Sequence, residues 1–244
     1  LTVQPTETAW GGNTLRFGVR LQSDFKSASQ FDLLAAHTLT WANSLGAEWR
    51  NILQIGGTRR FESEFYQPAS RDQTWFVSTA AGYRASDTDV YEDERRVARL
   101  AFSERKVGFY IGRQLGLIGE VRIGKTLNRA AAEPLIVATP TAGASVRYNA
   151  TEVRLRLDTL DSANFPRHGY SFLAFGQRAN FPEGGQAPRT QHAVGGSLAL
   201  SEGPWTLLSG AQYSAGERGG AVPIGGFLAL SGTPVESVSG DKTA

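Results

Sequence analysis

The chain has 244 residues, with 25 Lys and Arg against 23 Asp and Glu, so its net charge is only +2. The sequence pI near 9.0 depends on that small excess and gives weak support for a nucleic-acid partner. The mean hydropathy is −0.26, and no run approaches the roughly 18 apolar residues of a membrane-spanning helix. A helical membrane protein is therefore excluded. A β-barrel is not, because its outward apolar residues alternate with inward polar ones.

Composition adds to this interpretation. Cysteine is absent, which agrees with a periplasmic or outer-membrane location, and methionine is absent too. The 28 glycines and the 10% aromatic residues are typical of a barrel with tight turns and aromatic rings at the membrane interface. Since the chain opens at Leu1 with no signal peptide, we expect a fragment of a longer protein.

Alternation of apolar and polar residues predicts strands from residue 13 onward. It is cleanest in the first strand, where a period of two separates an apolar face from a charged one. Further strands are predicted over residues 30–42, 47–55, 60–67, 74–91, 96–114, 119–128, 144–159, 168–181, 189–201 and 204–215. The total is about eleven strands, of roughly the length that a tilted membrane strand requires.

The predicted connections differ in length. Those near 43–45, 69–73, 115–118, 160–168 and 201–204 are mostly tight, whereas those near 23–29, 129–143 and 182–188 are longer. Short turns on one side and long loops on the other are usual in outer-membrane barrels. A phase slip between residues 97–102 and 107–111 predicts a bulge or a strand that rises beyond the membrane. A soluble sandwich or barrel, whose strands also alternate, is the alternative.

The two faces of these strands define the candidate sites. We expect the polar face to line a lumen, where its charges either form cross-strand ion pairs, set what passes, or do both. Its residues are Arg16, Arg20, Glu48, Arg50, Gln54, Glu62, Glu64, Arg122, Arg154 and Arg156. We expect the apolar face to contact lipid, through Leu15, Phe17, Val19, Leu21, Trp49, Leu53, Phe61, Phe65, Val153, Leu155 and Leu157.

The stretch from Glu152 to Arg178 is the most informative hairpin. Two strands flank a Pro/Gly turn, in which Pro166 fixes φ and Gly169 allows a positive φ. The residues that define this turn are Asp158, Asp161, Phe165, Pro166 and Gly169.

Catalytic motifs are weak. A Walker-A pattern is formally present from Gly119 to Thr126, but its intervening residues continue a strand alternation, so we predict a strand. No G-x-S-x-G occurs. Barrel-embedded lipases have a serine two residues after the histidine, whereas here Ser171 is three residues after His168, and Val194 follows His192; we expect none of His37, His168 and His192 to be catalytic. The histidines are scattered, so no metal-ligand spacing emerges. We therefore expect no catalytic residue, metal or cofactor in these residues.

Three stretches resemble one family: LTVQPTETAWGGNTLRFGVRLQSDF at the start, DTLDSANFPRHGYSF, and IGGFLALSGTPVESVSGDKTA near the end. Together they resemble the bacterial surface antigen superfamily of outer-membrane barrels, which includes BamA and the two-partner secretion transporters. Residues 43–68 and the Leu230-Ser231-Gly232 stretch resemble, more closely, the barrel of patatin-like phospholipases of the type V secretion class.

The resemblance implies a sixteen-stranded transmembrane barrel preceded by a periplasmic POTRA domain and a patatin lipase. It makes residues 1–12 a segment leading in from the periplasm, 13–215 barrel strands, and 216–244 a long extracellular loop that folds into the lumen. The 158–169 turn would be periplasmic. Of the superfamily's loop tip, this sequence keeps Gly225, Gly226, Phe227 and Gly232 but has Leu230 and Ser231 and lacks the usual Arg.

We therefore expect an outer-membrane autotransporter barrel that anchors, and exports or displays, an upstream lipase, with no catalytic activity of its own. Its expected partners are outer-membrane lipids and the POTRA and lipase domains of the same chain, with a homodimer left open and no nucleic acid. The alternatives are a protein-transport or assembly barrel with no enzyme, and a porin-like channel. Because the first and last strands would be open edges in lipid, these residues alone should not insert stably.

Overall fold

The computed structural model describes residues 12–23, 29–92, 95–137, 143–162, 165–183 and 187–216. These residues form eleven strands: β1 (Asn13–Ser23), β2 (Ser29–Leu39), β3 (Glu48–Gly56), β4 (Thr58–Pro68), β5 (Trp75–Glu92), β6 (Arg95–Gln114), β7 (Gly119–Val137), β8 (Ala144–Asp158), β9 (Gly169–Asn180), β10 (Arg189–Glu202) and β11 (Trp205–Gly216). Over the described residues, no helix is long and apolar enough to cross a membrane.

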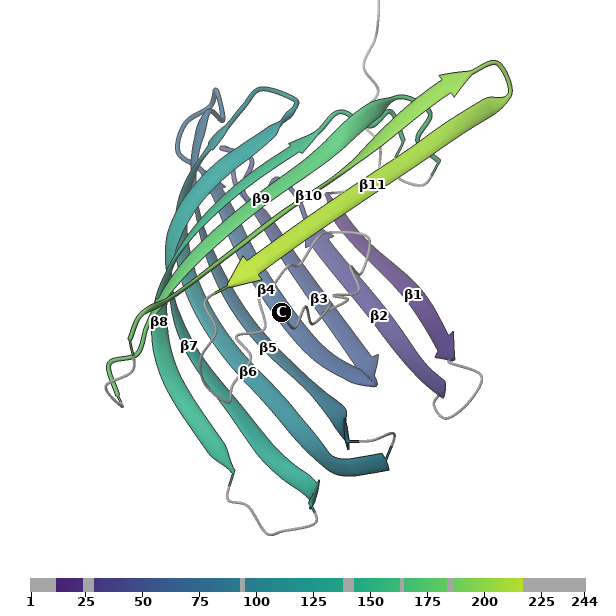
Figure 1. Ribbon diagram of the computed structural model, residues 1–244. Helices are drawn as coiled ribbons and strands as arrows, with labels where there is room; N and C mark the ends of the chain where they lie inside the picture. The colour runs from purple at the N-terminus through teal and green to yellow at the C-terminus, as the bar shows by residue number, and fades with distance from the viewer. Residues whose placement is uncertain are drawn as a thin grey trace, which may run out of the picture.

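The strands form one antiparallel sheet in which every strand pairs with its neighbours in sequence, from β1 at one edge to β11 at the other. The sheet is strongly curved into an open trough (Figure 1). This confirms the predicted all-β class and the predicted strand number. The trough does not close over the described residues, because β1 and β11 are its two edges and are not paired with each other.

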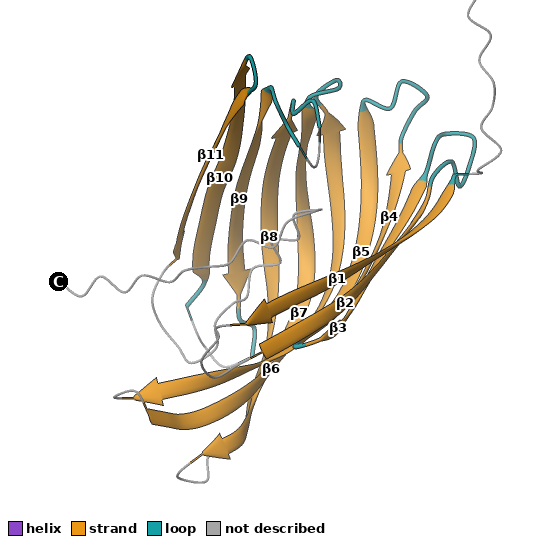
Figure 2. Cartoon of the chain, turned by 90° about the vertical axis from the view of Figure 1, so that its right-hand side faces the viewer, coloured by secondary structure: helices purple, strands orange, loops and turns teal. Residues whose placement is uncertain are grey.

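The connections gather at two ends of the sheet. We call the edge with connections 40–47, 69–74, 115–118, 159–168 and 203–204 the turn end, and the opposite edge the loop end. Figure 2 shows the turn end as the row of teal loops. The loop end is not uniformly long, contrary to the predicted pattern, because Gly57 alone joins β3 to β4. Gly56 has a φ of +150° there, and the amide of Gly57 donates to the carbonyl of Phe31 over 3.3 Å.

One strand differs in length from its prediction. The sequence predicted a strand that stops at 128 and a loop over 129–143, but β7 continues to Val137. The extra residues are held by β6, which pairs with β7 as far as Val137 opposite Ala98. The register shifts between Arg99 and Leu100, so that Leu100 faces Pro134. Proline has no amide hydrogen to donate to the ladder, and a bulge tolerates it. The pairing is unbroken from Leu100 to Gln114, so the slip predicted between residues 97–102 and 107–111 is not a bulge there, and the bulge lies at Arg99 instead.

The Walker-A pattern lies wholly within β7. From Glu120 to Thr126 every residue is paired with a residue of β6 and of β8, so no loop exists there to surround a phosphate. The prediction of a strand is confirmed. Gly124 packs closely against β6, where an added Cβ would overlap the ring of Tyr110.

Candidate functional site: the polar concave face

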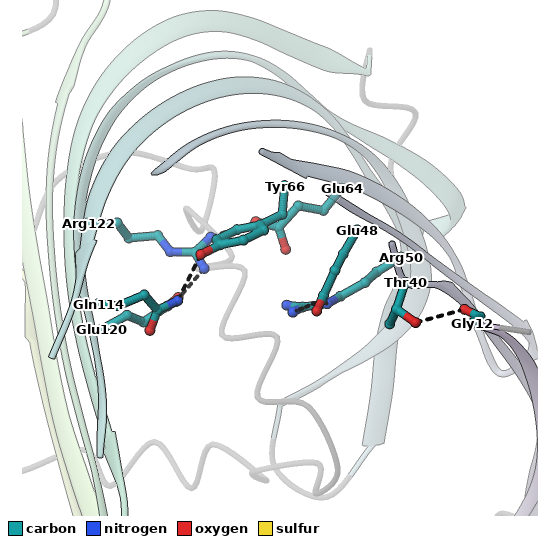
Figure 3. A network of polar contacts seen from close by, with 9 residues as sticks. All are labelled: Gly12, Thr40, Glu48, Arg50, Glu64, Tyr66, Gln114, Glu120 and Arg122. Atoms are coloured by element: carbon teal, nitrogen blue, oxygen red, sulfur yellow. Dashed lines mark hydrogen bonds and ion pairs between the residues drawn. The ribbon is translucent and has the colours of Figure 1, made fainter. Parts of the chain in front are cut away.

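The register separates the predicted polar and apolar sets completely. Following the pairs from β1 to β9, every residue predicted for a lumen falls on one face of the sheet, and every residue predicted for lipid falls on the other. Figure 3 shows that the polar face is the concave one, since Glu48, Arg50, Glu64 and Arg122 point into the trough. That this face lines a lumen and that the other contacts lipid remain predictions.

The convex face carries most of the exposed large apolar side chains. Phe17, Leu21 and Val19 are 77%, 79% and 69% exposed, and similar residues continue on the strands that follow, among them Leu53, Phe61, Val107, Ile123 and Leu198. Exposure of this much apolar surface to water would be unfavourable in free energy. The convex face is therefore suited to an apolar surrounding.

A first polar cluster lies near the turn end and is centred on Arg122. Its guanidinium Nη1 donates to Glu64 Oε1 over 2.6 Å, and Nη2 donates to Glu120 on the same strand. The Arg122 side chain is only 7% exposed and stacks over the ring of Phe76 at 5.3 Å. The Tyr66 hydroxyl accepts from Gln114 over 3.0 Å beside it (Figure 3). This cluster ties β4, β6 and β7 together across the concave surface.

A second polar cluster lies in the middle of the sheet and is centred on Glu152. One carboxylate oxygen accepts from Lys106 Nζ at 2.5 Å and from Gln177 Nε2 at 2.9 Å, and the other accepts from the hydroxyl of Tyr110 at 2.9 Å. Glu152 is 2% exposed and Lys106 is 9% exposed. Both oxygens have donors, so the carboxylate is not available to act as a base. It joins β6, β8 and β9, of which β6 and β8 are not neighbours.

Glycines make room for the aromatic rings on this face. An added Cβ at Gly112 would overlap the ring of Phe76, and one at Gly108 would approach the Tyr110 hydroxyl to 2.9 Å. The rings therefore lie flat on backbone that carries no side chain. This close packing explains why Phe76 and Tyr110 are 0% and 5% exposed in a sheet that is otherwise open.

Nearer the loop end, the concave face holds a small apolar core. Tyr148, Ala150, Ala179 and Phe181 are buried together, and the rings of Tyr148 and Phe181 are 5.6 Å apart. The Tyr148 hydroxyl donates to Glu104 over 2.5 Å.

The turn between β8 and β9 is organised by two aspartates. Asp161 accepts backbone hydrogen bonds from Arg167 at 2.8 Å and from His168 at 3.2 Å, which hold the pKa of its carboxyl below the usual value. Asp158 accepts from the amide of Leu160 over 3.1 Å.

The rest of this turn is open to solvent and anchored at one point. Gly169 has a φ of +106°, as its predicted role required, and Phe165, which precedes Pro166, is 85% exposed. The Arg167 guanidinium donates to the carbonyl of Gly203 over 2.7 Å, so the turn is fixed to the β10–β11 hairpin.

The described histidines are not arranged for catalysis. His168 lies in the exposed turn, with Nδ1 3.6 Å from Asp161. His37 contacts Asn13 and Asn51 on the convex face, and His192 packs near the ring of Tyr213. Over the described residues, no group of three or more His, Asp or Glu side chains could hold a metal ion. Within each concave cluster the charged and polar side chains bind one another, so these residues form a polar wall.

Some predicted residues lie outside the described part of the chain, and some residues of the Glu152 cluster were not predicted. The predicted loop residues Gly225, Gly226, Phe227, Leu230, Ser231 and Gly232 lie outside the described residues. Lys106, Tyr110 and Gln177 were not predicted from the sequence. Glu152 could have been found, because it has the same parity along β8 as Arg154 and Arg156.

Comparisons with known proteins support the fold. No family model matches the chain. No curated protein matches it either. Among solved structures, the crystal structure of BamA from Haemophilus ducreyi lacking POTRA domains 1–3 matches with a TM-score of 0.63 and 11% sequence identity, covering 86% of this chain. The chain spans 42% of the length of that structure. The strands of this chain therefore have the fold of the BamA barrel.

Proposed function

We propose that this chain is part of the wall of an outer-membrane β-barrel, with its convex face against lipid and its concave face towards a water-filled lumen. The separation of the two predicted sets, one polar and one apolar, between the two faces of one continuous sheet carries this proposal. An outer-membrane barrel provides hydrocarbon on one side and water on the other.

The height of the apolar surface fits a membrane. On β5 and β6, Trp75 lies opposite Arg113 and Tyr83 lies opposite Arg105. In each pair the guanidinium stacks over the aromatic ring, at 5.7 Å and 5.9 Å. The pairs are eight residues apart (83 − 75 and 113 − 105), or about 27 Å along a strand and about 21 Å along the membrane normal at a tilt of roughly 40°. Aromatic residues mark both interfaces of such barrels, and the apolar band is about 25 Å tall.

The open edges need partners. The outer edges of β1 and β11 are not paired within the described sheet, and lipid cannot satisfy backbone amides and carbonyls. We propose that further strands close the barrel between them. The turn end would then face the periplasm, as the resemblance implies for the 158–169 turn.

The role of the barrel is the finer part of the proposal. We propose that it anchors an upstream patatin-like lipase domain, through a POTRA domain, and exports or displays that domain. Support comes from the resemblance of residues 43–68 and 230–232 to barrels of the patatin-like type V class. An assembly or secretion barrel without an enzyme is the second candidate, and the BamA-like fold favours it equally.

The placement of the two faces can be tested by cysteine scanning, since the chain has no cysteine of its own. Single variants would be made in the full-length protein in intact outer membranes, at Val107 and Ile123 on the convex face and at Arg154 and Glu62 on the concave face. A charged maleimide should label the concave positions and leave the convex ones unlabelled until detergent is added. Equal labelling of both faces would overturn the proposal.

The role needs a different measurement. Protease added to intact cells should release a lipase-active domain if the barrel displays or exports an enzyme. A full-length protein with several POTRA repeats and no patatin G-x-S-x-G would instead support the assembly barrel. Large steady conductance in planar bilayers would favour a porin-like channel over both.

A further inference from the structure

Three arginines form a row across the convex face. Arg105 of β6 lies directly opposite Arg129 of β7, which lies directly opposite Arg147 of β8. All three are exposed. Residues directly opposite in an antiparallel pair have Cβ atoms about 5 Å apart, and like charges there repel each other. A row of three cations on adjacent strands is therefore unfavourable unless an anion is shared between them.

The described protein supplies little negative charge to this row. Glu183 lies 3.4 Å from Arg147, and both of those side chains are more than half exposed. No ion pair joins Arg105 or Arg129 to another described residue. Asp87 and Glu133, the other acidic residues of this part of the convex face, lie further towards the loop end, and Asp87 pairs with Arg59 and Arg99.

The row lies at one boundary of the apolar band. Arg105 is the residue that stacks on Tyr83, so the row coincides with the aromatic pair nearer the loop end. Towards the turn end, the convex face of β6 continues as Val107, Phe109 and Ile111, which are 60%, 49% and 48% exposed. Strand tilt changes the height across two strand spacings by only about 6 Å, similar to the thickness of one headgroup layer.

Two further cations lie on the same face. Lys125 and Arg178 lie opposite the two sides of Thr151, on the convex face and two same-face steps nearer the turn end than the row, with Leu127 and Asn149 between. Lys125 stands between Ile123 and Leu127 on an otherwise apolar strand face. Lys125 is paired with Phe109, midway between Arg105 and Arg113, so it adds positive charge to this face without being part of the row.

We propose that Arg105, Arg129 and Arg147 bind the phosphate groups of lipid headgroups in the membrane leaflet at the loop end. This inference depends on the proposed membrane barrel and adds a specific lipid chemistry to it. Arginine guanidinium groups bind phosphate oxygens in bidentate fashion, so a phosphate between neighbouring strands can satisfy two of them at once. The acyl chains of the same lipid would cover Val107 and Leu127, directly beside the row.

The test uses the full-length protein refolded into vesicles of phosphatidylcholine alone, or of phosphatidylcholine with a minor fraction of phosphatidic acid. Wild type is compared with R129Q/R147Q and with a control, R16Q/R20Q, which removes the same charge from the concave face. The charge-preserving R129K/R147K serves as a rescue variant. Bound phosphatidic acid is counted by native mass spectrometry, and the melting midpoint is read from heat-modifiable gel mobility.

Wild type and R16Q/R20Q should bind phosphatidic acid in preference to phosphatidylcholine and melt higher in its presence. R129Q/R147Q should bind it about 30-fold more weakly, since each arginine near an anionic surface contributes about fivefold. In phosphatidylcholine alone its midpoint should be no lower than that of wild type, because the repulsion is removed. R129K/R147K should recover only part of the binding, because lysine keeps the charge but cannot bind a phosphate in bidentate fashion.

Equal binding by wild type and R129Q/R147Q, or an equal loss in R16Q/R20Q, would overturn the inference while leaving the barrel intact. A melting shift by inorganic phosphate alone in detergent, as large as that by phosphatidic acid, would show a free-anion site and would also overturn it. If wild type shows no heat-modifiable band in either vesicle, the proposed membrane barrel itself fails.

Discussion

Substitution of Glu152 should be among the most destabilising polar changes in the chain. Its carboxylate is 2% exposed and accepts from Lys106, Tyr110 and Gln177. Glu152→Gln keeps the shape but removes the charge that faces Lys106 at 2.5 Å. Breaking one partner of a buried ion pair costs about 3 kcal/mol or more. Tyr110→Phe removes a single hydrogen bond to the same carboxylate and should cost about 1.5 kcal/mol.

The assay is urea unfolding of the full-length protein in detergent or vesicles, followed by tryptophan fluorescence. The double variant K106M/E152Q should lose less than the sum of the two single changes, by at least about 1.5 kcal/mol, because it removes both charges together. A cost below about 1 kcal/mol for Glu152→Gln would refute the reasoning. It would mean that water solvates these groups as it solvates a surface ion pair, and that the cluster does not hold β6 to β8.

Three other predictions follow from the same structure. Gly112→Ala should destabilise the sheet because its Cβ would overlap the Phe76 ring, whereas Gly176→Ala, with nothing within 4 Å, should be neutral or slightly stabilising in the same unfolding assay. Phe109→Arg on the convex face, midway between Arg105 and Arg113, should cost about 2–4 kcal/mol in vesicles, and Ile52→Arg on the concave face far less; equal costs would contradict the assignment of faces. Asp161→Ala should speed hydrogen exchange in the β8–β9 turn at neutral pH. The lowered pKa of Asp161 means that its stabilising effect is present above the unfolded pKa of about 3.9 and is lost as the pH falls through the folded value. The two proteins should therefore converge in acid, and a difference that persists there would count against the two amide bonds as its cause.

Local alternation was enough to predict which side chains share a face, because side chains along a strand alternate with a strict period of two. A pairing shifted by one residue would move every side chain of a strand to the opposite face. Arg16 to Leu21 and Val153 to Leu157 show this directly. Where apolar and polar residues do not alternate, the end of the strand was predicted wrongly. The Ala130–Ala132 run and Pro134 carry no apolar period, so the end of β7 could not be found without its partner strand. The hydrogen bonds that extend β7 come from residues of β6 about thirty positions earlier in the chain.

The buried clusters were beyond the reach of the sequence for a different reason. Lys106 and Glu152 are 46 positions apart and lie on strands that are not neighbours. Their contact requires the register of both intervening pairings and the curvature of the sheet. Parity along one strand could have placed Glu152 on the polar face, but no local pattern indicates that Lys106 reaches across β7 to it.

The ion pairs also change how the charged concave face should be understood. Arg122 forms ion pairs with Glu64 and Glu120, and Lys106 forms one with Glu152. The positive charges of Arg122 and Lys106 are therefore neutralised by acidic residues of the same sheet. Substituting them should alter stability before it alters what could pass along the trough. On the convex face the opposite holds, because the Arg105–Arg129–Arg147 row has little acidic charge of its own. Arg105 and Arg129, which form no ion pair with a described residue, thus lie on the surface that we assign to lipid, whereas the paired charges of the concave face serve first to hold the strands together.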